Sequence, residues 1–536
     1  MSFVPNSYQQ ISLFDKLAFL SQRKQRMLEK SWAQAFSNHI FTRINEHIFA
    51  PLYSEKMNSR PNAPINVLVG ALILKDFTNL TDKELTEACE FDFRYQYALH
   101  TTSFEDQPVS ERTLSRFRSR LAAYELTTGE DLLHQCFIEM ADGLRQYMDI
   151  SPAIKRMDSM MIESNIRKMG RLELLYTCLA NLVKELHRDG KLELLEGLEH
   201  YADPNDRNRV VYHDQDTPQS DRLQKVITDA CALLPKCGED YADSEDYQLL
   251  ERAIREQTKR DEGGRNVPKG KGDGMDSSSL QNPSDPDATY RKKAGKEHRG
   301  YAANITETVD VNGSVVTDYQ YDSNTRSDVD FLQESIRKAK TTDDVTAIIA
   351  DGAYASEDLA AQAADKNIGL ITTGLRGRKP REILTQFVLS EDGHTVMQCP
   401  EGHTPKSSSY IRQSESIRVS FPRCCCGNCP HQQECKAKIK KRTALVILSL
   451  GALAHTEEAI RRKDDEAVKL IGRIRNGVET IPSILRRKYH VDDMPVRGKL
   501  KTKMSFGFKM FALNFSKLWL HERGLEKCRP LQPENA

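Results

Sequence analysis

Two aspartates beside apolar segments are the first candidates for chemistry. Asp158 lies in a predicted strand, residues 153–162, and Asp351 follows the mostly apolar run 345–350. Burying a carboxylate in such a place costs free energy unless a partner compensates for it. If the two strands are neighbours, both carboxylates can bind hard divalent cations such as Mg²⁺ or Mn²⁺, which take oxygen ligands. The alternative for Asp351-Gly352 is an ordinary strand-to-helix turn.

A third carboxylate is expected on a helix beside these strands, and Glu479 is the best candidate. Arg475 precedes it by four residues and Arg486 follows it by seven, so on one helix all three side chains lie on one side. Pro482 would weaken or kink that helix just past Glu479. Carboxylates that hold two metal ions about 4 Å apart suit in-line attack on a phosphodiester. The two arginines would hold phosphates near them.

The cysteines predict a second metal site. Of the 12 cysteines, five lie between residues 424 and 435, which in a reducing compartment indicates metal rather than disulfides. Cys424 and Cys425 are spare thiols, His403 or His431 could replace a thiolate, and reduced cysteines without metal are the alternative. The ligands expected for a tetrahedral, structural Zn²⁺ are Cys399, Cys426, Cys429 and Cys435.

The elements that must position these residues alternate between helix and strand. Apolar spacing predicts helices through most of 14–144, and charged, leucine-rich helices over 171–260 with breaks near 201–204 and Pro235. A flexible loop, 263–286, follows. The later elements predicted are a hairpin of strands 300–309 and 314–321 with its turn at Asn312-Gly313, a helix at 327–340, a strand at 345–350, a helix at 356–366 and a strand at 369–373.

Two helix starts can be read directly from the sequence. Thr81-Asp82-Lys83-Glu84 fits a capping box, and Ser110 precedes a second helix. That second helix is basic and either lies along DNA phosphates or forms an ordinary bundle surface. Its cations are Arg112, Arg116, Arg118 and Arg120.

Charge and composition narrow the class of protein. The hydrophobic share of 39% and charged share of 29% are those of a soluble globular chain, and the formal net charge is zero. Residues 436–529 nevertheless carry 23 Lys and Arg against 10 Asp and Glu, an excess of 13 that could neutralise phosphates. The first residues lack a signal-peptide pattern and no apolar run is long enough to span a bilayer. We therefore expect a cytoplasmic, nucleoid-associated protein without a membrane partner.

In this combination the residues resemble the DDE transposases of bacterial insertion sequences. Members carry a first Asp on an early strand, as in Met157-Asp158-Ser159, and a second in a strand-end motif, as in Asp351-Gly352-Ala353-Tyr354. Their last acid lies in a helix with Tyr, two residues, Arg, three residues, Glu, six residues, Lys. Arg475 and Glu479 fall on that spacing, whereas Gly472 replaces the Tyr and Arg486 the Lys, although Lys488 could also serve. Residues 64–118 and 496–514 resemble the helical N-terminal domain and the C-terminal tail of the family.

The resemblance implies an α/β fold, an RNase H-like mixed sheet flanked by helices, in the branch with a cysteine-rich insertion. Residues 1–148 would form a helical, DNA-binding domain and 149–525 the catalytic domain. Within the latter we expect a helical insertion at about 163–295 and a cysteine-rich insertion at about 376–444. Residues 526–536 would be a flexible tail.

The resemblance also implies an activity, namely metal-dependent cleavage at element ends and strand transfer in DNA transposition. Partners would be double-stranded DNA with terminal inverted repeats and a second copy of the chain on that DNA. Alternatives are a domesticated relative that binds DNA without cutting and a metal-dependent nuclease outside transposition. The cations expected to contact DNA are Arg475, Arg486, Lys488, Arg497, Lys499, Arg116 and Arg118.

Overall fold

The computed structural model divides the chain into two compact units. Unit 1 comprises Met1–Ala350, Ser356–Ile371 and Gly477–Ala536, and unit 2 comprises Asp351–Ala355 and Thr372–Asn476. The predicted flexible tail, 526–536, lies outside the described residues. No helix within the described residues is both long and apolar enough to cross a membrane. The structure describes residues 1–6, 15–54, 60–103, 109–214, 216–270, 272–293, 295–339, 345–354, 356–373, 381–463 and 465–524.

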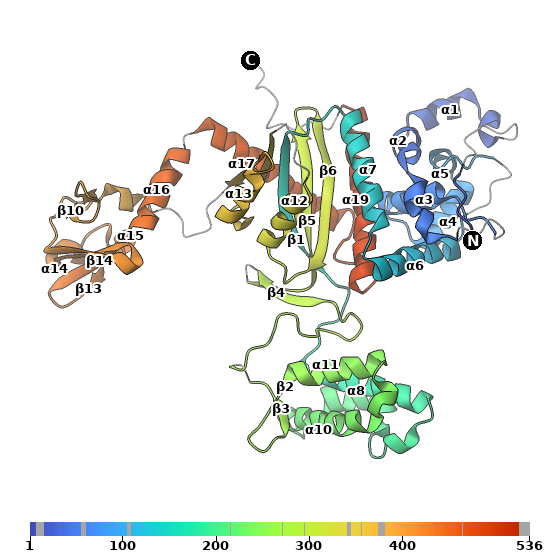
Figure 1. Ribbon diagram of the computed structural model, residues 1–536, viewed down its shortest axis with the longest axis horizontal. Coiled ribbons are helices and arrows are strands. Elements are labelled where there is room, and N and C mark those ends of the chain that lie inside the picture. The colour runs from blue at the N-terminus through green and yellow to red at the C-terminus, as the bar shows by residue number, and fades with distance from the viewer. Residues whose placement is uncertain are drawn as a thin grey trace. The chain divides into compact units, whose positions relative to one another are not determined.

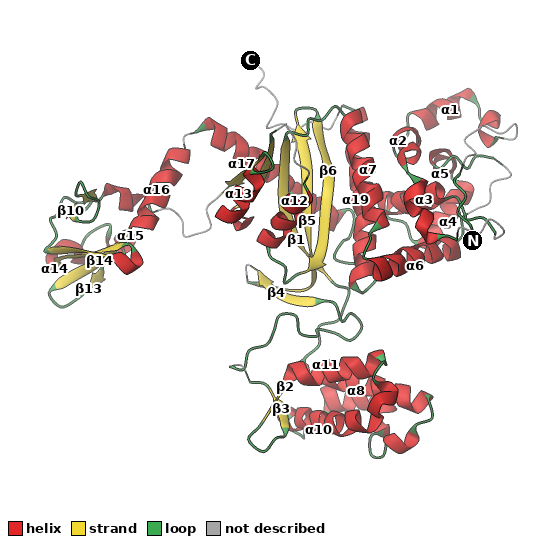
Figure 2. Ribbon diagram, in the orientation of Figure 1, coloured by secondary structure: helices red, strands yellow, loops and turns green. Residues whose placement is uncertain are grey.

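A six-stranded mixed sheet forms the centre of unit 1 (Figures 1 and 2). The strands run in the order β4-β5-β1-β7-β8, and β6 also pairs with β5. β1 is antiparallel to β5 and parallel to β7, so hairpin and crossover connections are combined in one sheet. The strands are β1 (Ile154–Glu163), β4 (Thr289–Lys293), β5 (Lys296–Asp310), β6 (Gly313–Ser323), β7 (Thr346–Asp351) and β8 (Ile368–Thr373).

The β5–β6 hairpin confirms the predicted pair of strands but shifts its turn by one residue. Asp310 pairs with Gly313, so Val311 and Asn312 form the turn and Gly313 already belongs to β6. A register shift follows between Thr306 and Glu307, where β6 contains one extra residue. Such a bulge bends the strand and increases the twist of the sheet.

One face of the sheet shares a hydrophobic core with the N-terminal and C-terminal helices. The long C-terminal helix α19 (Lys499–Glu522) contacts α3, α7 and β6. Its Phe515 ring lies edge-on to Phe36, with centroids 5.0 Å apart, and Phe511 meets Phe137 at 5.1 Å. The N-terminal helices are α1 (Gln22–Glu29), α2 (Trp32–His39), α3 (Ile65–Thr78), α4 (Asp82–Phe91), α5 (Phe93–Ala98), α6 (Glu111–Thr128) and α7 (Leu132–Tyr147).

Both predicted helix starts in this region are confirmed. The Thr81 hydroxyl accepts from the Glu84 amide at 3.2 Å, and the Glu84 carboxylate accepts from the Thr81 amide at 2.8 Å, which completes the capping box. The Ser110 hydroxyl caps α6 by accepting from the amide of Thr113. Because the N-terminal helices bury their apolar side chains in the same core as the sheet, the proposed boundary at residue 148 stays a prediction.

The other face of the sheet is covered by α12 (Asp328–Lys338). Phe331 of α12 forms a small apolar cluster with Met161 and Ala302, one from each central strand. The Ser159 hydroxyl donates to Asp328 at the start of the same helix, at 2.6 Å. Residues 157, 159 and 161 of β1 therefore face α12, whereas 156, 158, 160 and 162 face the larger core. Helix α13 (Glu357–Ala364) lies between β7 and β8 in the chain.

The segment between β1 and β4 is mainly helical and has a core of its own. The predicted break at 201–204 is confirmed, since Asp203 caps a new helix that begins at Pro204. The predicted break near Pro235 is displaced slightly, because the helix continues to Cys237. The elements are α8 (Arg171–Arg188), α9 (Pro204–Asn208), α10 (Gln219–Cys237), α11 (Glu245–Gln257), β2 (Thr258–Arg260) and β3 (Asn266–Pro268).

Unit 2 contains a four-stranded antiparallel sheet in the order β11-β12-β14-β13 and a separate pair, β9-β10. The apolar stretch 444–454 becomes the end of one strand and the start of a helix. The strands are β9 (Val388–Leu389), β10 (Val396–Gln398), β11 (Ser407–Ile411), β12 (Ser416–Pro422), β13 (Lys438–Ile439) and β14 (Thr443–Ser449). The helices are α14 (Arg423–Gly427), α15 (Gln432–Cys435), α16 (Leu450–Lys463) and α17 (Glu466–Val478), which ends in unit 1.

Candidate functional site

Asp158 lies in the middle of β1, on the face that also carries Arg156 and Met160. Its side chain is half-buried, and its Oδ1 accepts from the Ser159 amide at 3.0 Å. In the antiparallel pairing with β5, Asp158 stands opposite Ile305. The predicted strand is thus confirmed, and its pairing with β5 from Lys155 to Glu163 fixes the backbone around the carboxylate.

A buried network of charges lies two residues before Asp158. Arg156 Nε donates to Glu307 Oε2 at 2.6 Å, and Lys517 Nζ donates to Glu307 Oε1 at 2.7 Å. Burial by itself would raise the pKa of the fully buried Glu307, but the charges of Lys517 and Arg156 and their hydrogen bonds lower it to about 2. The network joins β1, β5 and α19.

Glu479 stands at the junction of two helices rather than within one. α17 ends at Val478, and α18 (Thr480–Arg487) begins directly after Glu479. Pro482 explains the interruption, because it has no amide to donate to the carbonyl of Val478 and its ring crowds that carbonyl. The interruption that Pro482 was expected to cause is therefore present, although it falls at Glu479 itself, so the spacing of Arg475, Glu479 and Arg486 on one helix does not decide which way the three side chains face.

The two helices nevertheless contact β1 residues on both sides of Glu479 in the chain. A Cβ on Gly477 would lie 2.0 Å from Nη1 of Arg156, so the backbone there approaches β1 closely. Further along α18, Arg486 Nη2 donates to the carbonyl of Met161 at 2.7 Å. Glu479 lies between these two contacts in the chain, and the β1 residues that they touch flank Asp158.

Asp351 is the last residue of β7. The paired part of β7 runs parallel to β1 with Ile349 opposite Arg156. Oδ1 of Asp351 accepts from the Gly352 amide at 2.6 Å, and Oδ2 lies 3.8 Å from Nη2 of Arg475. The side chain of Asp351 is 47% exposed, so the carboxylate is accessible to solvent.

Most of the cations expected to contact DNA bind protein groups in this structure. Besides its bond to Met161, Arg486 donates to Asp492 at 3.0 Å. Lys488 donates to Ser516 at 2.7 Å and lies 4.9 Å from the ring centroid of Phe77, and burial lowers its pKa. Through these contacts both cations stabilise the packing of unit 1. Their contact with DNA stays a prediction.

Three further cations that were expected to contact DNA also bind protein groups, and a fourth is exposed. Arg497 donates to the carbonyl of Asn165 at 2.7 Å, and Lys499 pairs with Asp322. Arg118 of α6 pairs with Asp82 at the start of α4; burial alone would raise the pKa of this Asp82 carboxyl, but Arg118 and Lys75 hold it at about 2. Arg116, on the same helix, is exposed.

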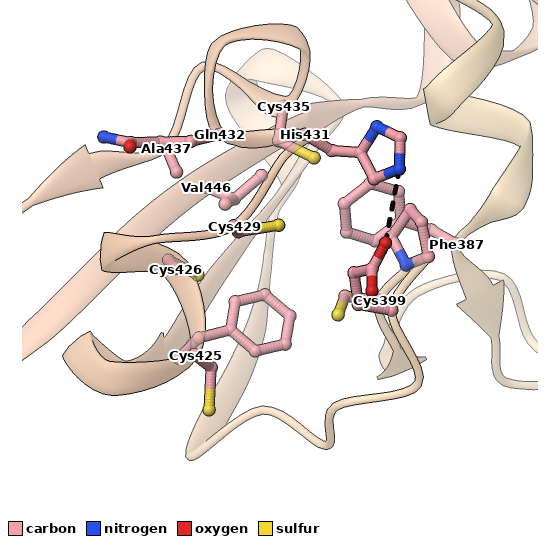
Figure 3. A pocket seen from close by; sticks show the side chains of 13 residues that line it. Phe387, Cys399, Cys425, Cys426, Cys429, His431, Gln432, Cys435, Ala437 and Val446 are labelled. Carbon is pink, nitrogen blue, oxygen red and sulfur yellow. Dashed lines mark ion pairs between the residues drawn. The ribbon is translucent and has the colours of Figure 1, made fainter.

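In unit 2, the four expected zinc ligands line one pocket (Figure 3). Cys399, Cys426, Cys429 and Cys435 surround the same space, whereas the Cys425 sulfur points away from it. Burial and the neighbouring thiols raise the pKa of Cys426 and Cys435 to about 11. Backbone hydrogen bonds form turns at two of the cysteines. The Cys399 amide donates to the His403 carbonyl at 3.0 Å, and the Cys435 amide donates to the His431 carbonyl at 2.8 Å.

His431, an alternative zinc ligand, has two carboxylate neighbours in the pocket. Its Nε2 lies 3.3 Å from Glu401 and its Nδ1 3.3 Å from Glu434. Within the described ranges, no group of three His, Cys, Asp or Glu side chains is gathered closely enough to hold a metal ion. The thiols of the pocket thus line one space without being gathered into a coordination sphere, which a bound metal would have to draw together.

The network of Arg156, Glu307 and Lys517 was not predicted from the sequence, nor was the close approach at Gly477. The sequence did contain one unusual residue in β5 and one in α19. Glu307 is the one charged side chain within residues 301–309 of β5, and Lys517 lies in the aromatic run of α19. Sequence spacing identifies such residues as unusual but cannot pair them, because they lie more than 150 positions apart along the chain.

Two family descriptions match the chain. Residues 398–519 match "Transposase DDE domain", a range that includes Glu479 and the four cysteines but neither Asp158 nor Asp351. Residues 24–120 match "Transposase domain (DUF772)", which spans α1 to most of α6. No curated protein matches the chain.

One solved structure is similar over most of the chain. It is described as the cryo-EM structure of a piggyBac transposase synaptic complex with hairpin DNA. The match covers 97% of this chain and 79% of the other at 10% identity, with a TM-score of 0.30. At that TM-score the likeness carries no argument about this protein.

Proposed function

Because the two family matches identify the chain as a DDE-type transposase of the insertion-sequence kind, we propose that it cleaves DNA at the ends of its element and transfers the strands to a target. The observation that carries this proposal is the approach of the α17–α18 junction to β1. Contacts of Gly477 with Arg156 and of Arg486 with Met161 support a position of the last acid, Glu479, near the stretch of sheet that holds the first, Asp158.

The sheet supports an RNase H-like catalytic domain. β1, with the first acid, is central, and the antiparallel β5–β6 hairpin lies on one side of it. On its other side lies the parallel strand β7, with the second acid at its end. In the parallel pairing of β1 with β7, Arg156 stands opposite Ile349. Asp158 lies two residues after Arg156, and Asp351 lies two residues after Ile349. This arrangement suits convergence of the two carboxylates.

The three acids would hold the divalent metal, and carboxylate oxygens are suitable ligands for Mg²⁺ or Mn²⁺. When bound, two such ions activate a water or a 3′-hydroxyl and stabilise the leaving oxygen of a phosphodiester. Two observations support this role: the side chain of Asp351 is 47% exposed, and Asp158 is half-buried on a strand of the central sheet. Arg475, beside Asp351, would orient a phosphate with its guanidinium.

We propose a structural zinc ion for the cysteine pocket. Four thiols from two segments of unit 2 face one space, which is the donor set that a closed tetrahedral zinc site uses. Cys426 and Cys429 are separated by two residues, and the turns at Cys399 and Cys435 direct the other two sulfurs inward. His431 is the alternative donor, although its carboxylate neighbours already engage both ring nitrogens.

The partner implied by the proposed reaction is double-stranded DNA carrying terminal inverted repeats. Since two ends must be held together for joint insertion, the active form would be a homodimer on DNA. The protein would act in the cytoplasm, at the nucleoid. Of the expected DNA contacts, Arg116 on α6 is exposed, and the more buried Arg475 lies 3.8 Å from Asp351, where it would meet a phosphate held at the acids.

The test is cleavage of a linear duplex that carries the element's own end, with and without Mg²⁺. We expect a cut at the element end only when the metal is present, and loss of cutting to background in Asp158→Asn, Asp351→Asn and Glu479→Gln, with duplex binding retained. Asp243→Asn removes an exposed carboxylate on the helical segment and should cut normally.

Each outcome is informative. Normal cutting by any one of the three variants removes that residue from the site. Cutting by all three, or equal cutting of duplexes with and without the element's end, contradicts the proposal and favours a nuclease outside transposition. Specific binding to the end without any cutting by the wild type indicates a domesticated DNA-binding protein.

A further inference from the structure

The hairpin formed by β4 and the start of β5 is the most basic strand pair in the described part of unit 1 (Figure 1). Its strands meet through cross-strand pairs from Thr289 and Gly300 at the base to Lys293 and Lys296 at the tip. Lys292, Lys293 and Lys296 are exposed. None of these three lysines has an ion pair within the ranges that the structure describes.

The charges of this hairpin repel one another across the strands. Lys293 stands directly opposite Lys296, and Arg291 lies two residues before Lys293 on the same face. Like charges in directly opposite positions destabilise a β-hairpin. The only acid among the paired positions near the tip is Glu297, opposite Lys292 on the other face. A polyanion bound at the tip would remove this repulsion.

The base of the hairpin is fixed to the sheet, in contrast to its tip. Arg291 Nη1 donates to the carbonyls of Asn324 at 3.0 Å and Arg326 at 2.9 Å. His298 Nδ1 lies 2.7 Å from Glu163 Oε1, and the Arg299 guanidinium lies 5.4 Å from the ring centroid of Tyr290. The cations near the base thus orient the hairpin, while the three lysines at the tip remain available to solvent.

We infer that the β4–β5 tip is a binding site for the phosphate backbone of duplex DNA, outside the candidate catalytic site. Lysine ammonium groups are compact charges that neutralise phosphates without reading base sequence. The two strands of a duplex present phosphates at a high, regular density, which suits several lysines at the end of a narrow hairpin. This inference rests on the proposed function for the identity of the DNA.

The length of β5 predicts where this contact falls on the DNA. Asp158 is opposite Ile305, and Lys296 precedes Ile305 by nine residues on the same strand. At about 3.4 Å per residue, the tip is at most about 30 Å from Asp158 along β5. Since one base pair rises about 3.4 Å, a duplex that runs along β5 from the acids meets the tip within about nine base pairs of the cut.

The experiment measures binding of the full-length protein to a duplex with the element's own end, without divalent metal and over a range of salt. Removing both tip charges with Lys293→Gln/Lys296→Gln should lower the slope of log affinity against log salt by about two. Lys293→Arg/Lys296→Arg keeps the charges and should restore the slope. Lys184→Gln/Lys225→Gln removes two exposed lysines from α8 and α10 and controls for net charge.

An unchanged slope in the tip variant, or an equal loss in the α8–α10 control, overturns the inference. A second readout is the hydroxyl-radical footprint, in which the tip variant should lose protection within about nine base pairs of the cleaved phosphate while protection at the cut persists. If the tip variant binds DNA normally but fails to bind an acidic protein from the host, the surface serves that protein instead and the inference is wrong.

The failure of this inference can be distinguished from failure of the proposed function. The binding assay contains no divalent metal, so it does not depend on cleavage. Tip-dependent binding by a protein that never cuts DNA contradicts the proposed function and leaves the tip assigned. Metal-dependent cutting together with an unchanged salt slope in the tip variant supports the proposed function and contradicts the inference about the tip.

Discussion

The sheet of unit 1 and the cysteine pocket of unit 2 hold their candidate site residues by different physical means. The backbone at Asp158 is fixed by pairing with β5, and its strand packs on a core that includes side chains from Leu28 to Leu518. The pocket has behind it a core of only ten buried apolar residues, from Ile383 to Leu453. Small cores of this kind usually need a metal or disulfides in addition. The difference teaches that loss of metal should affect the two regions unequally.

The two regions also differ in the charges that their interiors contain. Unit 1 buries Glu307 between Arg156 and Lys517, so an ion network fixes the interior beside Asp158. In the pocket, burial and the neighbouring thiols raise the pKa of Cys426 and Cys435 to about 11, so these two thiols carry no charge at ordinary pH unless a metal binds them. Unit 1 should therefore respond to acid, and unit 2 to chelators.

Chelation should have the largest effect and should separate the two regions. We expect zinc in the purified protein and, once a chelator removes it, fast amide exchange across residues 381–463, because apparent zinc binding energies of about 10 kcal/mol are also folding energies. The only two tryptophans, Trp32 and Trp519, pack against the core of unit 1, so their fluorescence should not change.

Cys429→Ser should reproduce the effect of the chelator, and Cys424→Ser, at an exposed thiol that does not line the pocket, should keep its zinc. Elemental analysis checks both variants. Zinc-free wild-type protein with slow exchange over 381–463 would show that the cysteines are only reduced thiols, and the contrast between the units would disappear.

Acid should act on unit 1 through Glu307. Its pKa in the folded state is about 2, below the ordinary 4.5 expected of the unfolded chain. The stability that it contributes is thus fully present above pH 4.5 and is lost as the pH falls toward 2, on the order of 3 kcal/mol in total. Tryptophan-detected urea unfolding at pH 7 and pH 3 measures the loss.

Glu307→Gln should lower the free energy of unfolding at pH 7 by about 3–5 kcal/mol, because two buried cations lose their counter-charge. It should also lose the part of the pH dependence that Glu307 causes. A variant that is as stable as the wild type at pH 7, with the same acid response, would show that the network does not support the sheet.

A smaller effect is expected from Gly477→Ala. The new Cβ would lie 2.0 Å from Nη1 and 2.8 Å from Cζ of Arg156, which cannot turn aside freely because its Nε is bound to Glu307. Overpacking of this kind costs about 1–3 kcal/mol. Since the α17–α18 junction would move away from β1, DNA cleavage should fall further, by up to about 100-fold.

Gly472→Ala is the matched control for this prediction, because nothing lies within 4 Å of a Cβ at that position of α17. It should be neutral or slightly stabilising, as alanine is favoured over glycine within a helix. Equal cleavage by both variants would show that the close approach at Gly477 does not position Glu479.

Local features of the fold could be read from the sequence where neighbouring residues decide them. The capping box at Thr81, the start of α9 after Asp203 and the hairpin before Gly313 all depend on residues within a few positions. The interruption of the helix near Glu479 was also readable for a local reason, since Pro482 lacks the amide that would continue the hydrogen bonding of α17.

Interactions over long distances in the chain could not be read in this way. Nothing in the sequence pairs Arg156 with Glu307, or Arg486 with the carbonyl of Met161, because many cations compete for each acceptor. The same applies to Lys488, expected on DNA but found against Ser516 and Phe77. Charge and spacing in the sequence identify a cation as a candidate for binding phosphate. They do not show whether that cation faces DNA or packs against another part of the protein.

The sequence by itself determined the residue types of the candidate sites, the two segments that supply the cysteines, and the strands that carry Asp158 and Asp351, because composition and periodicity are local. Only the tertiary structure decided that β1 lies between β5 and β7, that a glycine lets α17 approach Arg156, and that the β4–β5 hairpin presents repelling lysines. These depend on which distant segments pack together, since burial of apolar surface sets the arrangement of the whole chain before any pair of charges can meet.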